Sequence, residues 1–100
     1  MAQTPEAKVK AKVVRILKDA GAYYFYPVTG GFGRSGIPDI VACYRGQFLG
    51  IECKAGRNKP TALQLKEMIS INDAGGATLV VNEDNINDVV KLLENVYVPD

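Results

Sequence analysis

A tight turn between two strand-like segments constrains this fold more than any other feature of the sequence. Residues 39–44 and 47–54 are rich in β-branched and other apolar side chains, and only Arg45 and Gly46 separate them. A two-residue connection joins neighbouring antiparallel strands, and glycine readily adopts the positive φ that such turns need. The sequence therefore predicts a β-hairpin over residues 39–54, and the rest of the chain must pack around it.

The register of this hairpin brings two acidic side chains together. With the turn centred between residues 45 and 46, Asp39 lies opposite Glu52. Side chains alternate along strands, so Asp39, Glu52 and Lys54 project from one face, and opposed Cβ atoms lie about 4.5 to 5.5 Å apart. Two carboxylates at that distance repel each other, and a divalent cation between them would remove the repulsion. Because the ligands are hard oxygens, Mg²⁺ or Mn²⁺ is the expected ion.

Two other interpretations of the hairpin stay open. A bulge in the turn would shift the pairing by one residue and place the two acids on opposite faces of the sheet. Alternatively, the hairpin is a surface element with scattered charges. The neighbouring residues favour a site, because Ile51 and Cys53 alternate with the polar positions and predict that the opposite face belongs to the core.

The composition excludes several classes of protein. One hundred residues suffice for one domain, which we expect to comprise residues 1–100. The chain has no histidine and two cysteines, which excludes histidine-based triads and leaves too few ligands for structural zinc. The hairpin register places Cys43 and Cys53 on opposite faces, and we expect both to be reduced, buried side chains.

The sequence also lacks the marks of membrane insertion or export. No apolar run is long enough to span a bilayer, and residues 1–8 do not show the basic, apolar and small-residue succession of a signal peptide. We therefore expect a cytoplasmic protein without a membrane partner.

The remaining segments predict an α/β fold. Thr4-Pro5-Glu6 has the cap residue, proline and acid that are typical of a helix start. The expected elements are a helix to about residue 20, a strand at 23–28, the two hairpin strands, a helix at 61–74, a strand at 77–81 and a helix from about Asp84 to Asn95. The order α-β-β-β-α-β-α, with the second helix as a crossover, predicts a small mixed β-sheet flanked by helices.

The charge distribution is strongly asymmetric although the whole chain carries a net charge of +1. Residues 1–66 hold eleven basic and four acidic residues, a net charge of +7, whereas residues 67–100 hold one lysine and seven acids, a net charge of −6. Such asymmetry is typical of nucleic-acid binding, with a chance pattern of solvated surfaces as the alternative.

The hairpin motif resembles that of a known group of nucleases. Gly36-Ile37-Pro38-Asp39, followed by Glu52-Cys53-Lys54, resembles the bipartite signature of the PD-(D/E)xK superfamily. With Glu6 in the first helix and Gln64 in the second, the pattern is similar to the VRR-NUC family, especially its small virus-type members, which are related to archaeal Holliday junction resolvases. The resemblance runs from Glu6 to about Val81 and implies the nuclease fold of that superfamily.

The resemblance also implies a role for each residue of the motif. Asp39 and Glu52 would bind Mg²⁺, for which Mn²⁺ substitutes, together with the backbone carbonyl of Cys53. Lys54 would position or deprotonate the attacking water and stabilise charge on the phosphate. A bound Mg²⁺ acidifies water and polarises phosphate, so this chemistry needs no histidine.

Glu6 and Gln64 have simpler explanations beside those that the resemblance implies. Glu6 would bind a metal-bound water or a second ion, and its position near the apolar stripe of Val9 and Val13 predicts that it points inward. An acid in the first helical turn is also favoured by the helix dipole alone. Gln64 would orient Lys54 or a phosphate, or it is an ordinary boundary residue of the second helix.

Several basic or polar residues are candidates for phosphate contacts. They are Lys8, Lys12 and Arg15 in the first helix, Arg34 and Ser35 in the glycine-rich stretch, and Arg57 and Lys59 beyond the hairpin. Contacts of this kind make DNA affinity sensitive to salt. The helix residues fit a solvated helix face equally well, and the glycine-rich stretch fits a plain connector.

The glycine-rich stretch also matches the dinucleotide-binding pattern G-x-G-x-x-G at residues 31–36. That pattern must open a helix, whereas here it leads into a strand. We therefore expect no nucleotide cofactor.

Four successive aromatic residues, Tyr23 to Tyr26, predict an exposed apolar surface, because two of the four must face away from the core. A homodimer interface is the commoner use of such a surface, and base stacking is the alternative. Stand-alone members of the similar family act as dimers, so the resemblance also implies a homodimer.

Together these features predict a metal-dependent DNA endonuclease that acts on branched DNA, as a Holliday junction resolvase does, and the resemblance implies a viral or phage origin. One alternative is a nuclease for duplex, flap or single-stranded DNA. The other is a catalytically silent nucleic-acid-binding module with the same fold.

Overall fold

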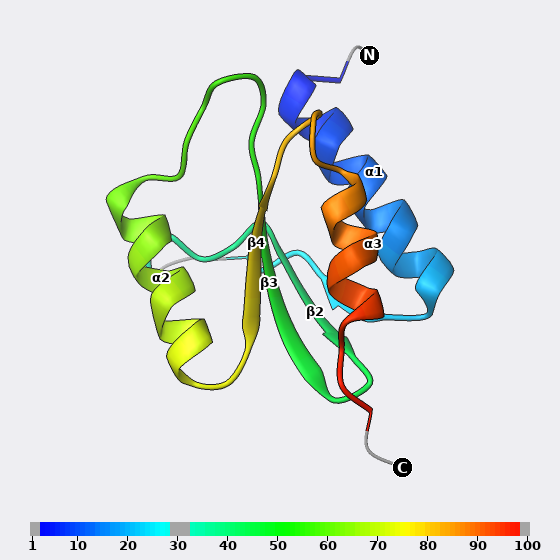
Figure 1. Cartoon of the computed structure of the whole chain (residues 1–100). Helices are drawn as coiled ribbons and strands as arrows, with labels where there is room; N and C mark the ends of the chain where they lie inside the picture. Colours follow the sequence, from blue (N-terminus) through cyan, green and yellow to red (C-terminus); the bar gives the residue numbers. More distant parts are fainter. Residues whose placement is uncertain (1–2, 29–32, 99–100) are drawn as a thin grey trace.

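The computed structural model describes residues 3–28 and 33–98, which form a four-stranded mixed sheet with helices on both faces (Figure 1). The elements are α1 (Pro5–Ala20), β1 (Tyr23–Phe25), β2 (Ile40–Tyr44), β3 (Gln47–Cys53), α2 (Ala62–Asp73), β4 (Ala77–Val81) and α3 (Asn87–Glu94). The strands lie in the order β1-β2-β3-β4, with α1 and α3 on one face and α2 on the other. The predicted fold class and element order are confirmed.

The hairpin has the register that the two-residue turn predicts. Tyr44 pairs with Gln47 and Ile40 with Ile51. Arg45 and Gly46 both have positive φ, 51° and 86°, as a type I′ turn requires. The turn therefore contains no bulge, and the alternative register is excluded.

The second helix connects two parallel strands. β3 and β4 pair in parallel, so α2 is the crossover between them. Leu49, Ile51 and Cys53 of β3 are buried in the core that α1 and α3 cover. Because side chains alternate along a strand, Gly50 and Glu52 face α2.

Residues at the ends of the helices determine where these begin and stop. The Thr4 hydroxyl accepts a hydrogen bond from the Ala7 amide at 3.1 Å, and Gly21, at φ 82°, ends α1. The last helix begins at Asn87, so the expected start near Asp84 is wrong. The side chain of Asn85 explains the difference, because it accepts from the Asn82 amide at 2.7 Å and holds the preceding residues in a turn.

The first strand is shorter than expected. Tyr23 to Phe25 pair with β2, whereas residues 26–28 lie outside the sheet. Pro27 explains the difference, because it has no N–H group for the ladder.

Cys43 is exposed, so the expectation that both cysteines are buried is wrong for this one. It lies between Tyr23 and Phe48 on the part of the sheet face that α2 leaves uncovered. Both cysteines are free thiols, as predicted. Among the described residues, no helix combines the length and apolar character that crossing a membrane requires.

Candidate active site

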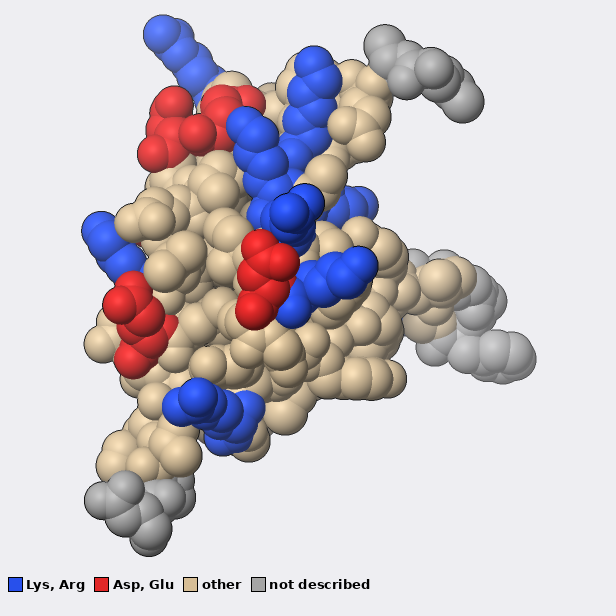
Figure 2. All heavy atoms as spheres, turned by 90° about the vertical axis from the view of Figure 1, so that its right-hand side faces the viewer, with Lys and Arg blue, Asp and Glu red and all other residues tan. Residues whose placement is uncertain are grey.

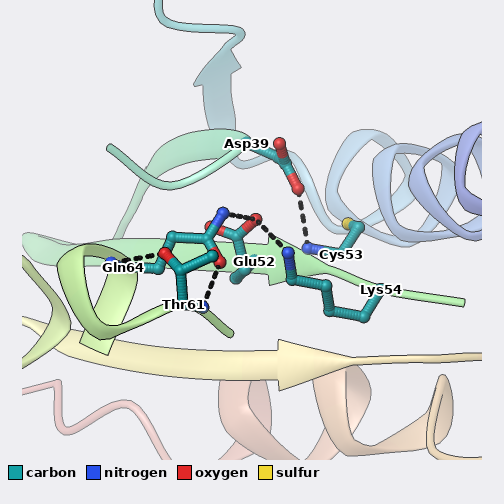
Figure 3. Close-up of polar contacts among 6 residues, drawn as sticks. All are labelled: Asp39, Glu52, Cys53, Lys54, Thr61 and Gln64. Atoms are coloured by element: carbon teal, nitrogen blue, oxygen red, sulfur yellow. Dashed lines mark hydrogen bonds and ion pairs between the residues drawn. The ribbon is translucent and has the colours of Figure 1, made fainter. Parts of the chain in front are cut away.

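The hairpin end opposite its turn carries three chemically active side chains. Asp39 stands directly before β2, Glu52 is the penultimate residue of β3, and Lys54 follows that strand. The pairing of Ile40 with Ile51 sets Asp39 beside Glu52 at the next position of the ladder. Figure 3 shows the three side chains at this end of the sheet.

Glu52 is the buried charged residue of this cluster. Its side chain is 2% exposed, and one carboxylate oxygen, Oε1, accepts a hydrogen bond from the Gln64 amide nitrogen at 3.1 Å. The Lys54 ammonium lies 3.9 Å from the same oxygen (Figure 3). The second oxygen, Oε2, is buried and has no hydrogen-bond partner among the described residues. A buried carboxylate oxygen without a partner is costly, and either a proton or a cation at this position would remove the cost.

The surroundings of Glu52 disfavour its charge. Burial and the neighbouring Asp39 carboxylate raise the pKa of Glu52 from 4.5 to about 8, although Lys54 acts in the opposite direction. In the absence of a cation, this side chain therefore holds a proton at neutral pH. A divalent cation at the free oxygen would replace that proton.

Asp39 is held by the backbone of the opposite strand. Its Oδ2 atom accepts a hydrogen bond from the Cys53 amide at 2.9 Å (Figure 3). The Cys53 thiol is buried, and burial raises the pKa of the thiol to about 12. Because side chains alternate along β3, the Cys53 side chain lies in the core on the face opposite Glu52, whereas the backbone of Cys53 lies beside both carboxylates.

Gln64 connects the second helix to Glu52. Thr61 and Gln64 form a capping box at the start of α2, in which the Gln64 side-chain oxygen accepts from the Thr61 amide at 2.8 Å. The nitrogen of the same side chain donates to Glu52. The structure thus brings Gln64 to Glu52, and its contact there is to the acid rather than to Lys54.

The loop before Asp39 packs against the same helical turn. Gly36 has φ +85°, and a Cβ atom there would lie 2.5 Å from the carbonyl oxygen of Leu63. Glycine is therefore required for this close approach, which fixes the loop that leads to Asp39.

Glu6 lies in the first turn of α1 and is exposed, so the prediction that it points inward is wrong. The apolar stripe begins at Val9, one turn later, because the first turn extends past the edge of the core. The charge of Glu6 nevertheless adds to the causes that raise the pKa of Glu52. The structure therefore keeps Glu6 near the acidic pair, but not in contact with it.

Arg34 is engaged by a protein carboxylate. Its Nε atom lies 3.0 Å from Oε1 of Glu67, whose side chain is 14% exposed. Ser35 is exposed beside it. The expectations about residues 29–32 of the glycine-rich stretch lie outside the described residues.

Arg57 and Lys59 are exposed in the segment that follows Lys54. That segment is held by Glu83, whose carboxylate accepts a hydrogen bond from the Gly56 amide at 2.6 Å. The two basic residues therefore lie in the exposed loop that begins directly after Lys54.

Lys8, Lys12 and Arg15 are exposed along α1. Figure 2 shows Lys and Arg side chains gathered over this face of the molecule, with carboxylates around and between them. On α1, Nε of Arg15 lies 3.3 Å from Oδ2 of Asp19. Lys8, Lys12 and Arg15 therefore form an exposed basic surface along α1.

We predicted no role for Lys10, which is half-buried, whereas Lys8, Lys12 and Arg15 are exposed. Its ammonium lies 5.6 Å from the centre of the Tyr26 ring. The sequence did contain one signal that pointed to Lys10. It lies four residues after Glu6, and residues four apart share one face of a helix.

The side chains of the site supply only some of the ligands that a small divalent cation needs. Within the described residues, no group of three or more His, Cys, Asp or Glu side chains is arranged to hold a metal ion. Asp39 and Glu52 supply two carboxylates, one with a buried oxygen lacking a partner. An ion at this position would complete its shell with backbone oxygen, water and phosphate, which suits Mg²⁺.

Comparison with known proteins agrees with this arrangement. The family model described as archaeal Holliday junction resolvase (hjc) matches residues 6–81. "Putative nuclease p44" of Acyrthosiphon pisum secondary endosymbiont phage 1 is 34% identical over 59 residues, which cover 58% of this chain and 63% of that protein. The match thus spans less than two thirds of the length of that relative.

A solved structure described as a VRR_NUC domain has the same fold. It gives a TM-score of 0.73 at 26% identity and covers 95% of this chain and 100% of that chain. The residues that the family model matches, 6–81, include Asp39, Glu52 and Lys54.

Proposed function

Because the chain belongs to the archaeal Holliday junction resolvase family and has the VRR-NUC fold of the PD-(D/E)xK nucleases, we propose that it is a metal-dependent DNA endonuclease acting on branched DNA. The proposed reaction is hydrolysis of a phosphodiester bond. We assign this reaction to a single domain that comprises residues 1–100. We expect the protein to act inside the cell that contains its DNA substrate.

The observation that carries this proposal is the buried Glu52 carboxyl group beside Asp39. One of its oxygens has no hydrogen-bond partner in the part of the chain that the structure describes, and its pKa is raised to about 8. A protein that only bound DNA would gain nothing from two opposed acids beside a phosphate. The pair favours a cation site over the alternative of a silent binding module.

Asp39 and Glu52 would hold Mg²⁺, or Mn²⁺ in its place, with the backbone carbonyl of Cys53, and Glu6 would act through water. When bound, such an ion acidifies water and neutralises charge on the phosphate. The hydrogen bond from the Cys53 amide fixes the Asp39 carboxylate, and Gln64 fixes that of Glu52. Both acids are therefore oriented before the substrate arrives.

Lys54 would act on the phosphate and the attacking water. Its ammonium lies 3.9 Å from Glu52, and the side chain is only 13% exposed. A cation held in this sheltered position stabilises negative charge that develops on the phosphate more strongly than an exposed one does. With Glu52 serving as a metal ligand, the Lys54 ammonium would be free to contact the substrate.

The basic residues around the site would bind the DNA backbone. Arg57 and Lys59 adjoin Lys54, whereas Lys8, Lys12 and Arg15 extend the positive surface along α1. Ser35 and Arg34 would contribute from the loop before Asp39, with a phosphate replacing Glu67 as the partner of Arg34. Because Lys and Arg contacts to phosphates release counterions, affinity is expected to fall steeply with salt.

We propose that the nuclease works as a homodimer through the uncovered sheet face. Tyr23 is 70% exposed, Phe25 46% and Phe48 45%, and Cys43 lies between Tyr23 and Phe48. Clustered exposed aromatic side chains are typical of protein interfaces. A dimer would set two sites at a fixed separation, as paired cuts across a symmetric junction require.

The test is cleavage of a labelled four-way junction and of a matched linear duplex, each with Mg²⁺ and with chelator. We expect Mg²⁺-dependent cleavage of the junction, loss of cleavage in Glu52→Ala and Lys54→Ala, and a dimer by light scattering. Equal cleavage of both substrates would contradict the selectivity for branched DNA. Binding without cleavage would favour the silent binding module.

A further inference from the structure

Lys10 differs from the other basic residues of α1 in where it lies. Lys8, Lys12 and Arg15 are exposed, whereas Lys10 is half-buried. It follows Glu6 by four residues and therefore lies on the same face of the helix, toward the end of the sheet that carries the acidic pair. Among the described residues, it is the α1 cation that lies over an aromatic ring.

An aromatic ring at the end of β1 holds the Lys10 ammonium. The nitrogen lies 5.6 Å from the centre of the Tyr26 ring, within the range of a cation–π contact. Tyr26 packs edge-on against Tyr24, which in turn packs against the core. The Tyr26 ring is therefore supported by Tyr24. The ring limits the movement of the Lys10 ammonium and leaves the N–H groups of the lysine free to donate hydrogen bonds.

The sheet register places this contact near Asp39. Phe25 pairs with Val41, so Tyr26 lies near Ile40, which is the residue after Asp39. No carboxylate of the described residues pairs with Lys10 in an ion bridge. Its charge is also near enough to Cys53 to oppose the rise in the pKa of that thiol, which burial and Asp39 cause.

We propose that Lys10 is a second lysine of the site, which binds an oxygen of a DNA phosphate next to the cleaved bond from the side of α1. Lys54 serves the opposite side of the acidic pair, after β3. This inference rests on the proposed nuclease function. Tyr26 is a positioning residue in it, because the ring keeps the ammonium oriented before the strand binds.

Three variants test the role of Lys10. Lys10→Met removes the charge and keeps the apolar stem, and Lys10→Arg keeps both the charge and the ring contact. Lys18→Met removes an equal charge from the far end of α1 and is the matched control. Each protein is measured for binding to a labelled four-way junction in chelator at several salt concentrations, and for the single-turnover cleavage rate in Mg²⁺ at saturating protein.

For Lys10→Met we expect binding weakened about tenfold, and the slope of log affinity against log salt reduced by about 0.9, as loss of one phosphate contact requires. The saturated cleavage rate should fall by about tenfold. Lys10→Arg should keep most of both, and Lys18→Met should stay within about twofold of the wild type.

Wild-type affinity, salt slope and rate in Lys10→Met would overturn the inference. A lower melting temperature with an unchanged salt slope would overturn it as well, because it would show that Lys10 only supports Tyr26. Failure of the proposed function is distinguishable, since the wild-type protein would then not cleave DNA in Mg²⁺ at all.

Discussion

Replacing Glu52 by glutamine is expected to stabilise the metal-free protein at neutral pH. Glutamine keeps the size of the side chain and an oxygen that accepts from Gln64, and its amide group can donate toward Asp39. It never carries the negative charge that burial opposes. The wild-type protein should therefore lose stability with rising pH over a range in which the variant does not.

The pKa of Glu52 fixes the size and the sign of this effect. It is raised from 4.5 to about 8. Below pH 4.5 the folded and unfolded chains both hold the proton. Between pH 4.5 and 8 only the folded chain holds it, so the free energy of unfolding falls by about 1.4 kcal/mol per pH unit. The loss is about 3 kcal/mol at pH 7 and levels off near 5 kcal/mol above pH 8.

Urea unfolding in chelator, from pH 4 to pH 8.5, measures the effect. The difference between Glu52→Gln and the wild type should be small at pH 4 and grow to about 3 kcal/mol at pH 7. Glu94→Gln, at an exposed position of α3, should follow the wild-type profile. Parallel profiles of the wild type and Glu52→Gln would refute the reasoning, because they would show that Glu52 is charged in the folded protein.

Three further outcomes follow from the site. Millimolar Mn²⁺ should raise the wild-type melting temperature at pH 7.5 and leave that of Asp39→Asn unchanged, and an equal rise in both would exclude Asp39 as a ligand. Gly36→Ala should lower the free energy of unfolding by about 2 kcal/mol or more, because the added Cβ meets the Leu63 carbonyl. Gly21→Ala, at a similar φ but with open space around it, should lower the free energy of unfolding by only about 1 kcal/mol. Equal losses in the two variants would show that the contact with Leu63 has no role. Gln64→Ala should slow cleavage about tenfold, because Glu52 loses its hydrogen bond from Gln64. The variant also loses half of the capping box, so its free energy of unfolding in urea should fall by about 1 kcal/mol. Unchanged cleavage would show that Glu52 does not need the hydrogen bond from Gln64.

The sequence was sufficient to predict the hairpin because local chemistry determines it. Arg45-Gly46 allows a two-residue turn, and the turn fixes which residues lie opposite each other. The pairing of Asp39 with Glu52 and the alternation of polar and core positions then follow from the period of a strand. The order of the elements follows similarly from caps and glycine stops.

What the sequence did not predict at Cys43, Arg34 and Lys10 depends on packing between distant segments, whereas the ends of β1 and α3 were misjudged at the local signals Pro27 and Asn85. Cys43 is exposed because α2 covers only part of its sheet face, and no local pattern states how far a crossover helix reaches. The contact of Arg34 with Glu67 joins a loop to a helix thirty-three residues later. Lys10 was missed because the ring beneath it belongs to another element.

Cleavage of one four-way junction by the wild type and by Glu52→Gln, with increasing Mg²⁺, tests the central claim most directly. The account predicts that the wild-type rate rises with Mg²⁺ from no detectable cleavage in chelator and then saturates. Glu52→Gln should remain folded and bind the junction, yet not cleave it at any Mg²⁺ concentration. Cleavage in chelator, or cleavage by Glu52→Gln at the wild-type rate, would contradict the assignment of the acidic pair as the metal site of a nuclease.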